Sequence, residues 1–239
     1  MLVAAAVCPC PPLLVPEVAA GAAPELDTAR AACTDALGVL AASRPDLLVV
    51  VGPGDGAGPE SYPEGTPGTF KGFGVDMDVR LGRARDDGPA GRELPYGPAI
   101  GAWLLSRTGW ADAPVEALAV GEDLTPERCT EAGEALARRA ERVALLVMGD
   151  ASACRTLKAP GYLDERAAPY DAELARALGA ADTGALRALD AGPARELKVS
   201  GRAPWQVLAG AAAGNPRLSG TLLYDDAPYG VGYLVATWS

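Results

Sequence analysis

The residue types that could do chemistry in this chain are limited, because histidine is absent from all 239 residues. Histidine is the usual acid–base group near neutral pH and the commonest metal ligand. Any chemistry must therefore rest on Cys, Asp, Glu, Tyr, Ser, Lys or Arg. The first candidate is the thiol-bearing turn Cys8-Pro9-Cys10, which follows the apolar run from Leu2 to Val7.

Polar turns follow each of four apolar runs and carry most of the candidate site residues. Ligands in α/β proteins bind at the carboxyl ends of strands, so turns that follow strands should meet in one crevice. The sequence therefore predicts a pocket with up to three thiols, in which Cys10 at the mouth lies near Asp55, Asp150 and Asp225 or Asp226. The four turns are Cys8-Pro9-Cys10, Gly52 to Gly56, Gly149 to Arg155 and Tyr224-Asp225-Asp226.

The Cys-x-Cys turn supports two interpretations. We expect Cys8 and Cys10 to point to opposite faces of the extended chain, so that only the Cys10 thiol enters the pocket. Thiolate and carboxylate ligands suit a soft metal, copper(I) or zinc, and Cys10, Asp55 and Asp225 form a candidate metal set. The alternative is that both cysteines are small buried hydrophobic residues, as free cysteines usually are.

The turn that follows Met148 supplies further candidates. Asp150 and Ser152 are candidate catalytic residues, and Arg155 and Lys158 could bind an anionic substrate. Tyr224 could donate a phenolic hydrogen bond to the same substrate. Each has a plainer alternative: the Asp150 carboxylate could cap the next turn, the two cations could lie on the surface, and Tyr224 could pack the terminal hairpin.

Unbroken apolar runs of strand length indicate the elements that must position these residues. Strands without polar alternation are buried on both faces, which requires a sheet covered by helices on both sides. The last of the runs and the segment that follows it predict a terminal hairpin. The runs are Leu2 to Val7, Asp46 to Val51, Val143 to Met148 and Leu218 to Tyr224, and the second hairpin strand is Gly230 to Trp238.

Apolar residues at helical spacing predict the covering helices. One helix carries Leu26, Cys33, Leu37 and Leu40, and another carries Cys129, Ala132, Leu136 and Ala140. The second helix has Thr125 as its expected N-cap and Pro126 at its first position. Cys33 and Cys129 are therefore expected in the core.

Three longer segments complete the predicted organisation. The glycine- and proline-rich stretch from Gly52 to Gly74 is too long for a simple connection and favours an ordered functional loop or lid. Mixed charges from Asp86 to Glu93 indicate a solvated excursion. The segment from Tyr170 to Ala213 has a helical pattern with interruptions at Pro193 and around Gly201 to Pro204.

Chain length and the strand–helix–strand pattern predict one α/β domain over residues 1–239 with a mostly parallel, helix-covered sheet. A net charge of −10 and the absence of a basic stripe argue against direct nucleic-acid binding. No apolar run approaches the roughly 20 residues that span a bilayer, so no membrane association is expected. Five cysteines without a disulfide pattern indicate a cytoplasmic protein.

The order of these motifs resembles the catalytic B subunit of class III extradiol ring-cleavage dioxygenases. The similarity covers essentially the whole chain and is nearest to an actinobacterial branch of a superfamily that includes the Memo-like proteins. The Gly-Asp-x-Ser turn and the downstream Ala-Pro-Tyr-Asp are moderately specific. The motifs are the Cys-Pro-x-Pro-Pro turn at Cys8, Leu146 to Ser152, Lys158-Ala159-Pro160-Gly161-Tyr162 and Ala168-Pro169-Tyr170-Asp171.

The resemblance implies a two-histidine, one-carboxylate iron(II) site in active members. Its histidines would stand at Cys10 and near Asp55, and the acid–base histidine at Ala153. This chain keeps the scaffold and lacks every histidine of that mechanism, so no ferrous iron is expected.

We therefore expect a divergent homologue that binds a small molecule without ferrous ring cleavage. One alternative is a metal- or thiol-dependent oxidoreductase built on Cys10, Asp55 and a C-terminal carboxylate. Another is a protein-interaction scaffold without pocket chemistry. A homo-oligomer is compatible with the sequence.

Overall fold

The structure is a computed structural model that describes residues 1–83 and 92–239. In these residues a seven-stranded sheet has the order β3-β6-β2-β7-β1-β9-β8. Its four parallel strands are β1 (Leu2–Cys8), β2 (Leu47–Gly54), β6 (Val115–Gly121) and β7 (Val143–Met148). Antiparallel strands close both sides of this parallel core: β3 (Glu60–Tyr62), β9 (Tyr233–Trp238) and β8 (Gly220–Asp226).

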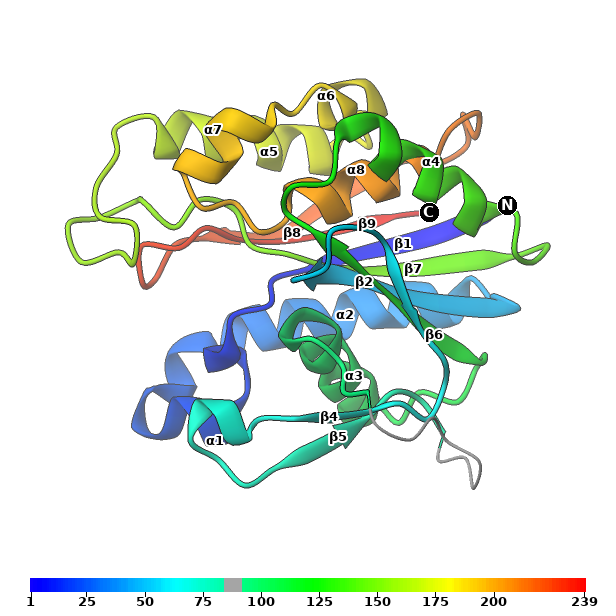
Figure 1. Ribbon diagram of the computed structural model, residues 1–239, viewed down its shortest axis with the longest axis horizontal. Coiled ribbons are helices and arrows are strands. Elements are labelled where there is room, and N and C mark those ends of the chain that lie inside the picture. The colour runs from blue at the N-terminus through cyan, green and yellow to red at the C-terminus, as the bar shows by residue number, and fades with distance from the viewer. Residues whose placement is uncertain (84–91) are drawn as a thin grey trace.

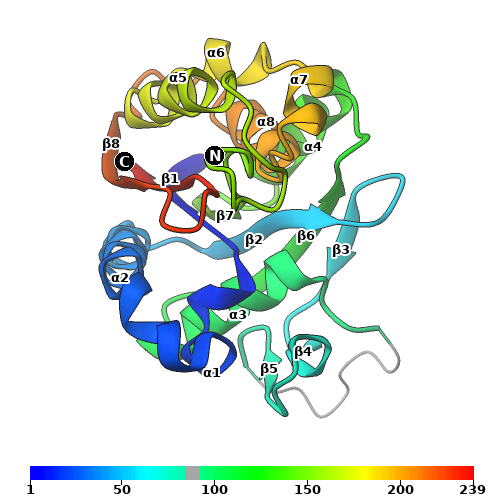
Figure 2. The same cartoon turned by 90° about the vertical axis from the view of Figure 1, so that its left-hand side faces the viewer.

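Helices cover both faces of the sheet, as Figures 1 and 2 show. The predicted α/β class with a mostly parallel, helix-covered sheet in one domain is therefore confirmed. On one face lie α1 (Pro16–Ala19), α2 (Asp27–Ala42) and α3 (Tyr96–Thr108), with the small sheet of β4 (Pro67–Thr69) and β5 (Asp78–Arg80) packed beneath α3. On the other face lie α4 (Pro126–Ala137), α5 (Ala167–Gly179), α6 (Thr183–Arg187), α7 (Ala191–Glu196) and α8 (Arg202–Ala211).

Burial explains why the inner strands lack polar alternation. Strands β7 and β9 are buried at every residue, and alternate residues of β1 join two separate apolar clusters on the two faces. The predicted positions of the first three strands and of the terminal hairpin are confirmed. The sequence pattern did not predict strand β6, because Glu116 interrupts its apolar run and forms an ion pair with Arg139 at the surface.

Strand β8 corrects the expectation that all four apolar runs are buried on both faces. It forms an edge of the sheet, and Leu222 and Leu223 remain 37% and 39% exposed. An edge strand has one neighbour only, so an apolar sequence does not guarantee burial there.

The helices largely follow their sequence signals. Helix α4 begins at Pro126, and the Thr125 side chain accepts a hydrogen bond from the Arg128 N–H, as its N-cap role predicts. Pro193 does not interrupt a helix, because it occupies the first turn of α7, where a missing N–H costs nothing.

The segment after β2 contains β3, β4 and a short 3-10 helix, Lys71–Phe73. Phe73 at its end lines the cavity at the strand ends. The excursion predicted for residues 86–93 lies outside the described residues except for Arg92 and Glu93, both exposed.

Candidate functional site

A cavity of about 500 Å³ lies at the edge of the sheet where the parallel strands end. This is the position at which open α/β sheets bind ligands. Apolar, aromatic and polar side chains all contribute to its lining. Its lining comprises Cys10, Pro11, Pro12, Leu13, Phe73, Tyr96, Glu122, Asp150, Ala153, Pro160, Lys198, Ser200, Tyr229, Val231 and Tyr233.

Cys10 follows β1 directly and is completely buried while lining the cavity. It therefore lies within the wall rather than at the expected mouth. Burial raises the pKa of its thiol well above the ordinary value, and the negative charge of Asp150 adds to the rise, while hydrogen bonding by Ser200 and Tyr96 opposes it. The neutral thiol is consequently the form present at neutral pH.

The expectation that Cys8 and Cys10 point to opposite faces is wrong. Both side chains belong to the same apolar cluster, together with Ala4 and Ala6. The physical reason is that residues two apart in an extended strand share a face, and only adjacent residues alternate. Cys33 packs in this cluster as well, whereas Cys129 and Cys154 are buried on the other face, so all five thiols are free and buried.

Asp150 joins the ends of two neighbouring strands. Its Oδ1 accepts a hydrogen bond from the Cys10 N–H at 2.8 Å, across 140 residues of sequence. The Asp150 N–H donates to Ser200 Oγ at 2.9 Å, and the Gly201 N–H donates to the Asp150 carbonyl at 3.0 Å. A Cβ on Gly149 would overlap Gly201, so only glycine allows this close approach.

The Asp150 carboxyl group has an altered acidity. Burial raises its pKa to about 7, and the hydrogen bond from the Cys10 N–H only partly opposes this effect. The side chain still reaches the cavity, where it is half-buried. Asp150 can therefore gain or lose a proton near neutral pH, the property that histidine supplies in other proteins.

Two tyrosines from separate elements flank this carboxyl group. Tyr96 begins α3 and Tyr233 begins β9, and both line the cavity. Burial raises the pKa of each phenol, and the nearby charge of Asp150 raises it further. Both hydroxyl groups therefore stay protonated and can donate hydrogen bonds to a ligand.

Lys198 and Glu122 bring opposite charges to the exposed rim of the cavity. Lys198 has a positive φ of 57°, a conformation that residues other than glycine adopt rarely and at some energetic cost. Glu122 follows β6, and its carbonyl accepts a hydrogen bond from the buried Arg202 guanidinium. Arg202 thereby fixes the turn that carries Glu122.

Ser152 and Arg155 do not line the cavity. Ser152 is fully buried, and its N–H and hydroxyl donate to the two oxygens of Asp171 at 2.9 and 2.8 Å. Arg155 pairs with the same carboxylate at 3.0 Å. The roles expected for Ser152 in catalysis and for Arg155 in substrate binding are therefore corrected: both belong to a buried structural network.

The remaining predicted substrate-binding residues also lie outside the cavity lining. Lys158 is exposed. Tyr224 packs on the apolar cluster beneath the hairpin, as its plainer interpretation predicts, and Asp225 and Asp226 are exposed in the edge strand β8. Ala153, which replaces the acid–base histidine implied by the resemblance, does line the cavity.

Asp55 lies in a neighbouring cavity of about 380 Å³, which shares Tyr96 and Glu122 with the first. The candidate metal set of Cys10, Asp55 and Asp225 is thus spread over a cavity wall, a second cavity and an exposed edge strand. Within residues 1–83 and 92–239, no three Cys, Asp or Glu side chains gather as a metal site would require. The residues present do not fit the iron(II) centre of the resembling family.

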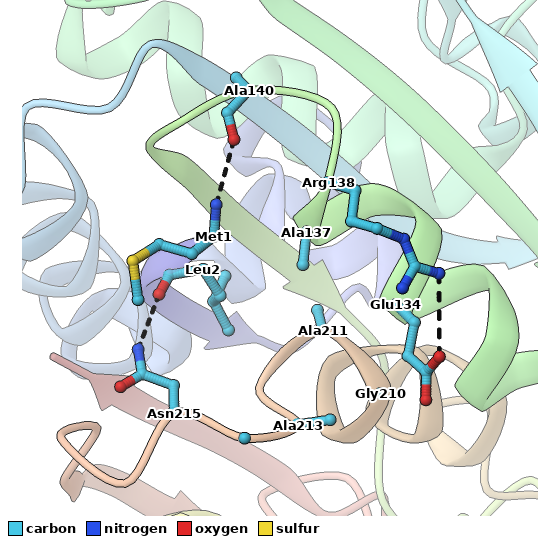
Figure 3. Close-up of a pocket in the computed structure, with 11 residues that line it drawn as sticks. Met1, Leu2, Glu134, Ala137, Arg138, Ala140, Gly210, Ala211, Ala213 and Asn215 are labelled. Carbon is cyan, nitrogen blue, oxygen red and sulfur yellow. Dashed lines mark hydrogen bonds and ion pairs between the residues drawn. The ribbon is translucent and has the colours of Figure 1, made fainter.

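A separate cavity of about 730 Å³ lies at the opposite end of the parallel strands (Figure 3). Its lining is mostly backbone and small side chains such as Ala137 and Ala211. The polar groups there are largely satisfied: Met1 N donates to the carbonyls of Ala140 and Glu141, and Asn215 Nδ2 donates to that of Leu2. We therefore place the candidate site at the carboxyl ends of the strands.

The residues that complete the candidate site were missed by sequence reasoning: Tyr96, Glu122, Lys198, Ser200 and Tyr233. Tyr96 and Tyr233 carry a weak signal, because each is a polar aromatic residue at the first position of an apolar element. Lys198 and Ser200 carry none, since Lys198 reaches the cavity and Ser200 reaches Asp150 only in three dimensions.

Comparisons with known proteins place this architecture among known folds. No family model and no curated protein matches the chain. A solved structure that matches is that of uncharacterized protein JW3007 from Escherichia coli K12, with a TM-score of 0.60, 14% identity and 99% of each chain covered. At this identity the likeness shows a shared fold. No helix in the described part of the chain is long and apolar enough to cross a membrane.

Proposed function

We propose that this protein is a class III extradiol dioxygenase-like homologue that binds a small molecule without ferrous ring cleavage. The observation that carries the proposal is the cavity of about 500 Å³ at the strand ends, which is lined by apolar and aromatic residues together with polar side chains such as Asp150 and Ser200. Such a combination is typical of small-molecule sites.

The lining indicates the chemistry of the ligand. Rings of Phe73, Tyr96 and Tyr233, together with Pro11 and Pro12, offer flat apolar surfaces. Asp150, Tyr96 and Tyr233 also line the cavity and carry groups that can hydrogen-bond a ligand. A compact ligand with an apolar, ring-sized body and one oxygen-bearing edge complements these surfaces.

Ring cleavage of the family type would need groups that this chain does not have. Cys10 and Ala153 stand where the resemblance implies histidines, and Asp55 lies in the neighbouring cavity. Aerobic incubation of the iron(II)-loaded protein with protocatechuate and catechol is expected to give no yellow ring-fission product. Turnover well above that of free iron(II) would contradict the proposal.

The rival functions have less support. A thiol-dependent oxidoreductase needs a reactive thiolate, and burial raises the pKa of Cys10. A metal-dependent oxidoreductase needs the candidate ligands Cys10, Asp55 and Asp225 to lie together, and the fold separates them. A protein-interaction scaffold without pocket chemistry does not account for the polar residues that line the cavity.

We therefore propose a cytoplasmic protein whose partner is a small molecule. Its acidic net charge favours the proposal that it does not bind nucleic acid directly.

Blocking the cavity tests the proposal directly. Binding of catechol, protocatechuate and 1-indanone is measured by saturation-transfer NMR and calorimetry on the intact chain. Val231→Trp fills the candidate cavity and is expected to weaken binding at least about tenfold. Ala213→Trp places the same bulk in the cavity of Figure 3 and is the matched control. Equal binding by both variants, or loss in the control alone, would contradict the proposed site.

A further inference from the structure

The Asp150 carboxylate has one fixed and one free oxygen. Oδ1 is held by the Cys10 N–H, whereas no hydrogen bond to Oδ2 is found among the residues that the structure describes. The backbone on either side is fixed by Ser200 and Gly201. The carboxylate is thus oriented within a cavity with one oxygen available, which is the arrangement that a general base requires.

Two tyrosines from other elements line the same cavity as this oxygen. Tyr96 on α3 and Tyr233 on β9 line the same cavity, and both are close enough to Asp150 for its charge to raise their pKa values. Tyr233 is buried, whereas Tyr96 is 37% exposed at the cavity. Neutral phenols can donate hydrogen bonds to an oxygen on which negative charge develops. Base and donors therefore come from three different elements around one space.

We propose that this pocket catalyses proton transfer at the carbon atom next to a carbonyl group, with Asp150 as the base and Tyr96 and Tyr233 as hydrogen-bond donors to the carbonyl oxygen. The substrate class is an enolisable carbonyl compound of ring size. This inference rests on the proposed function, since the substrate must bind in the same cavity.

The step balances without any further reactant. The C–H bond of the substrate breaks and an O–H bond forms on Asp150, while the electron pair moves through the new C=C bond to the carbonyl oxygen. The two phenols stabilise that enolate oxygen by hydrogen bonds and keep their protons. While the enolate is bound, Asp150 can trade the abstracted proton for one from solvent. Return of a solvent proton (a deuteron in D₂O) to the same carbon completes an exchange, and return of the proton to a different carbon of the enolate system completes an isomerisation; either step regenerates the base.

The rate should follow the ionisation of Asp150, because only the carboxylate accepts a proton. The titratable and polar groups that line the cavity with it are the Cys10 thiol after β1, Tyr96 from α3, Glu122 after β6, Lys198 and Ser200 before α8, and Tyr229 and Tyr233 from the hairpin. Since burial raises the pKa of Asp150 to about 7, we expect the rate to rise with pH and to level off above about pH 8.

Hydrogen–deuterium exchange tests this proposal. The intact protein is incubated with 1-indanone or phenylacetone in D₂O, and loss of the α-proton signal is followed by NMR. We expect at least about 100-fold acceleration over buffer, loss of that acceleration in Asp150→Asn, and a decrease of about 10- to 100-fold in Tyr96→Phe and in Tyr233→Phe. Asp150→Asn retains an oxygen for the Cys10 N–H, and circular dichroism verifies its fold.

Asp225→Asn, which changes an exposed carboxylate of β8, is the matched control and should keep the full rate. Binding of the same ketones is measured separately, so the two proposals can fail independently. Bound ketone without exchange would overturn the catalytic inference and leave the binding proposal standing. Exchange that survives in Asp150→Asn and in both phenylalanine variants, or no exchange with either ketone, would also overturn the inference.

Discussion

At the scale of single residues, hydrogen bonding distinguishes the roles of two aspartates, Asp150 and Asp171. Both Asp150 and Asp171 are enclosed by the fold. Both carboxylate oxygens of Asp171 accept hydrogen bonds, from Ser152 and from Arg155, so Asp171 belongs to the structural framework. Only Oδ1 of Asp150 accepts a hydrogen bond among the described residues, and Asp150 lines the cavity. The unused hydrogen-bonding capacity, rather than the residue type, marks Asp150 as the functional candidate.

Asp150 should lower the stability of the protein as the pH rises. Its pKa is about 7 in the folded state and about 4 in the unfolded state, so the folded state binds more protons between these values. This group's contribution to the free energy of unfolding is therefore full below about pH 4. It falls as the pH rises toward 7, by on the order of 4 kcal/mol in total.

Asp150→Asn removes this dependence, and the variant should be more stable than the wild type at pH 8. Urea denaturation at pH 5 and at pH 8, followed by circular dichroism, measures the difference. A wild type that exceeds the variant equally at both pH values would contradict the raised pKa.

Replacing Asp171 should destabilise the fold strongly. Asp171→Ala leaves the Ser152 N–H and hydroxyl without their acceptor and separates Arg155 from its counter-charge in a buried place. The expected loss is about 3 kcal/mol of unfolding free energy. Asp226→Ala is the control, because its carboxylate is exposed and accepts a hydrogen bond from the neighbouring Ala227 N–H, and a change within about 0.5 kcal/mol is expected there. Similar losses in both variants would refute the network.

At the scale of elements, two glycines determine how closely α4 and α8 pack. A Cβ on Gly133 would overlap the Val207 carbonyl oxygen, and a Cβ on Gly210 would overlap the Thr130 carbonyl oxygen. The helices thus touch backbone to backbone. Helix α8 begins immediately after Ser200 and Gly201, which hold Asp150, so this contact also fixes one wall of the candidate site.

Gly133→Ala should therefore destabilise the protein although alanine favours a helix by about 1 kcal/mol. Forcing a methyl group between the two backbones is expected to cost about 3 kcal/mol. Gly38→Ala on α2 is the matched control, since no atom lies within 4 Å of the added Cβ, and it should stabilise by up to about 1 kcal/mol. Thermal and urea unfolding of both variants decide this; a neutral Gly133→Ala would show that the helices can separate freely.

At the scale of the whole molecule, two apolar layers enclose the sheet and all five thiols. Cys10 alone lines the candidate cavity. Access of a reagent to the other four therefore requires opening of a layer, whereas access to Cys10 requires entry into the cavity only.

Alkylation by iodoacetamide at pH 8 should accordingly be slow for the folded protein, because burial raises the pKa of the Cys10 thiol. Cys10 should react first, and a bound ketone or catechol should slow it further. Cys33 and Cys129 should react only at the rate of unfolding. Mass-spectrometric mapping over time gives the order, and earlier reaction of Cys33 or Cys129 would place the cavity elsewhere.

The sequence by itself determined the class of fold and the edge of the sheet at which chemistry is expected. Apolar runs of strand length predict strands, three of which lie in the covered interior of the sheet, and Thr125-Pro126 marks a helix start through local backbone chemistry. The lack of histidine likewise limits the chemistry to thiol, carboxyl, hydroxyl and cationic side chains, whichever way the chain folds. These properties depend on composition and on neighbours in the chain, which is why they can be predicted.

Only the tertiary structure decided which polar residues share the cavity. Asp150 meets the Cys10 N–H across 140 residues and Ser200 across 50, and Tyr96 and Tyr233 arrive from a helix and a strand on other parts of the chain. Ser152 and Arg155, which adjoin Asp150 in sequence, are instead bound to Asp171. The acidity of a carboxyl group depends on burial and on through-space partners, and neither is encoded in local spacing.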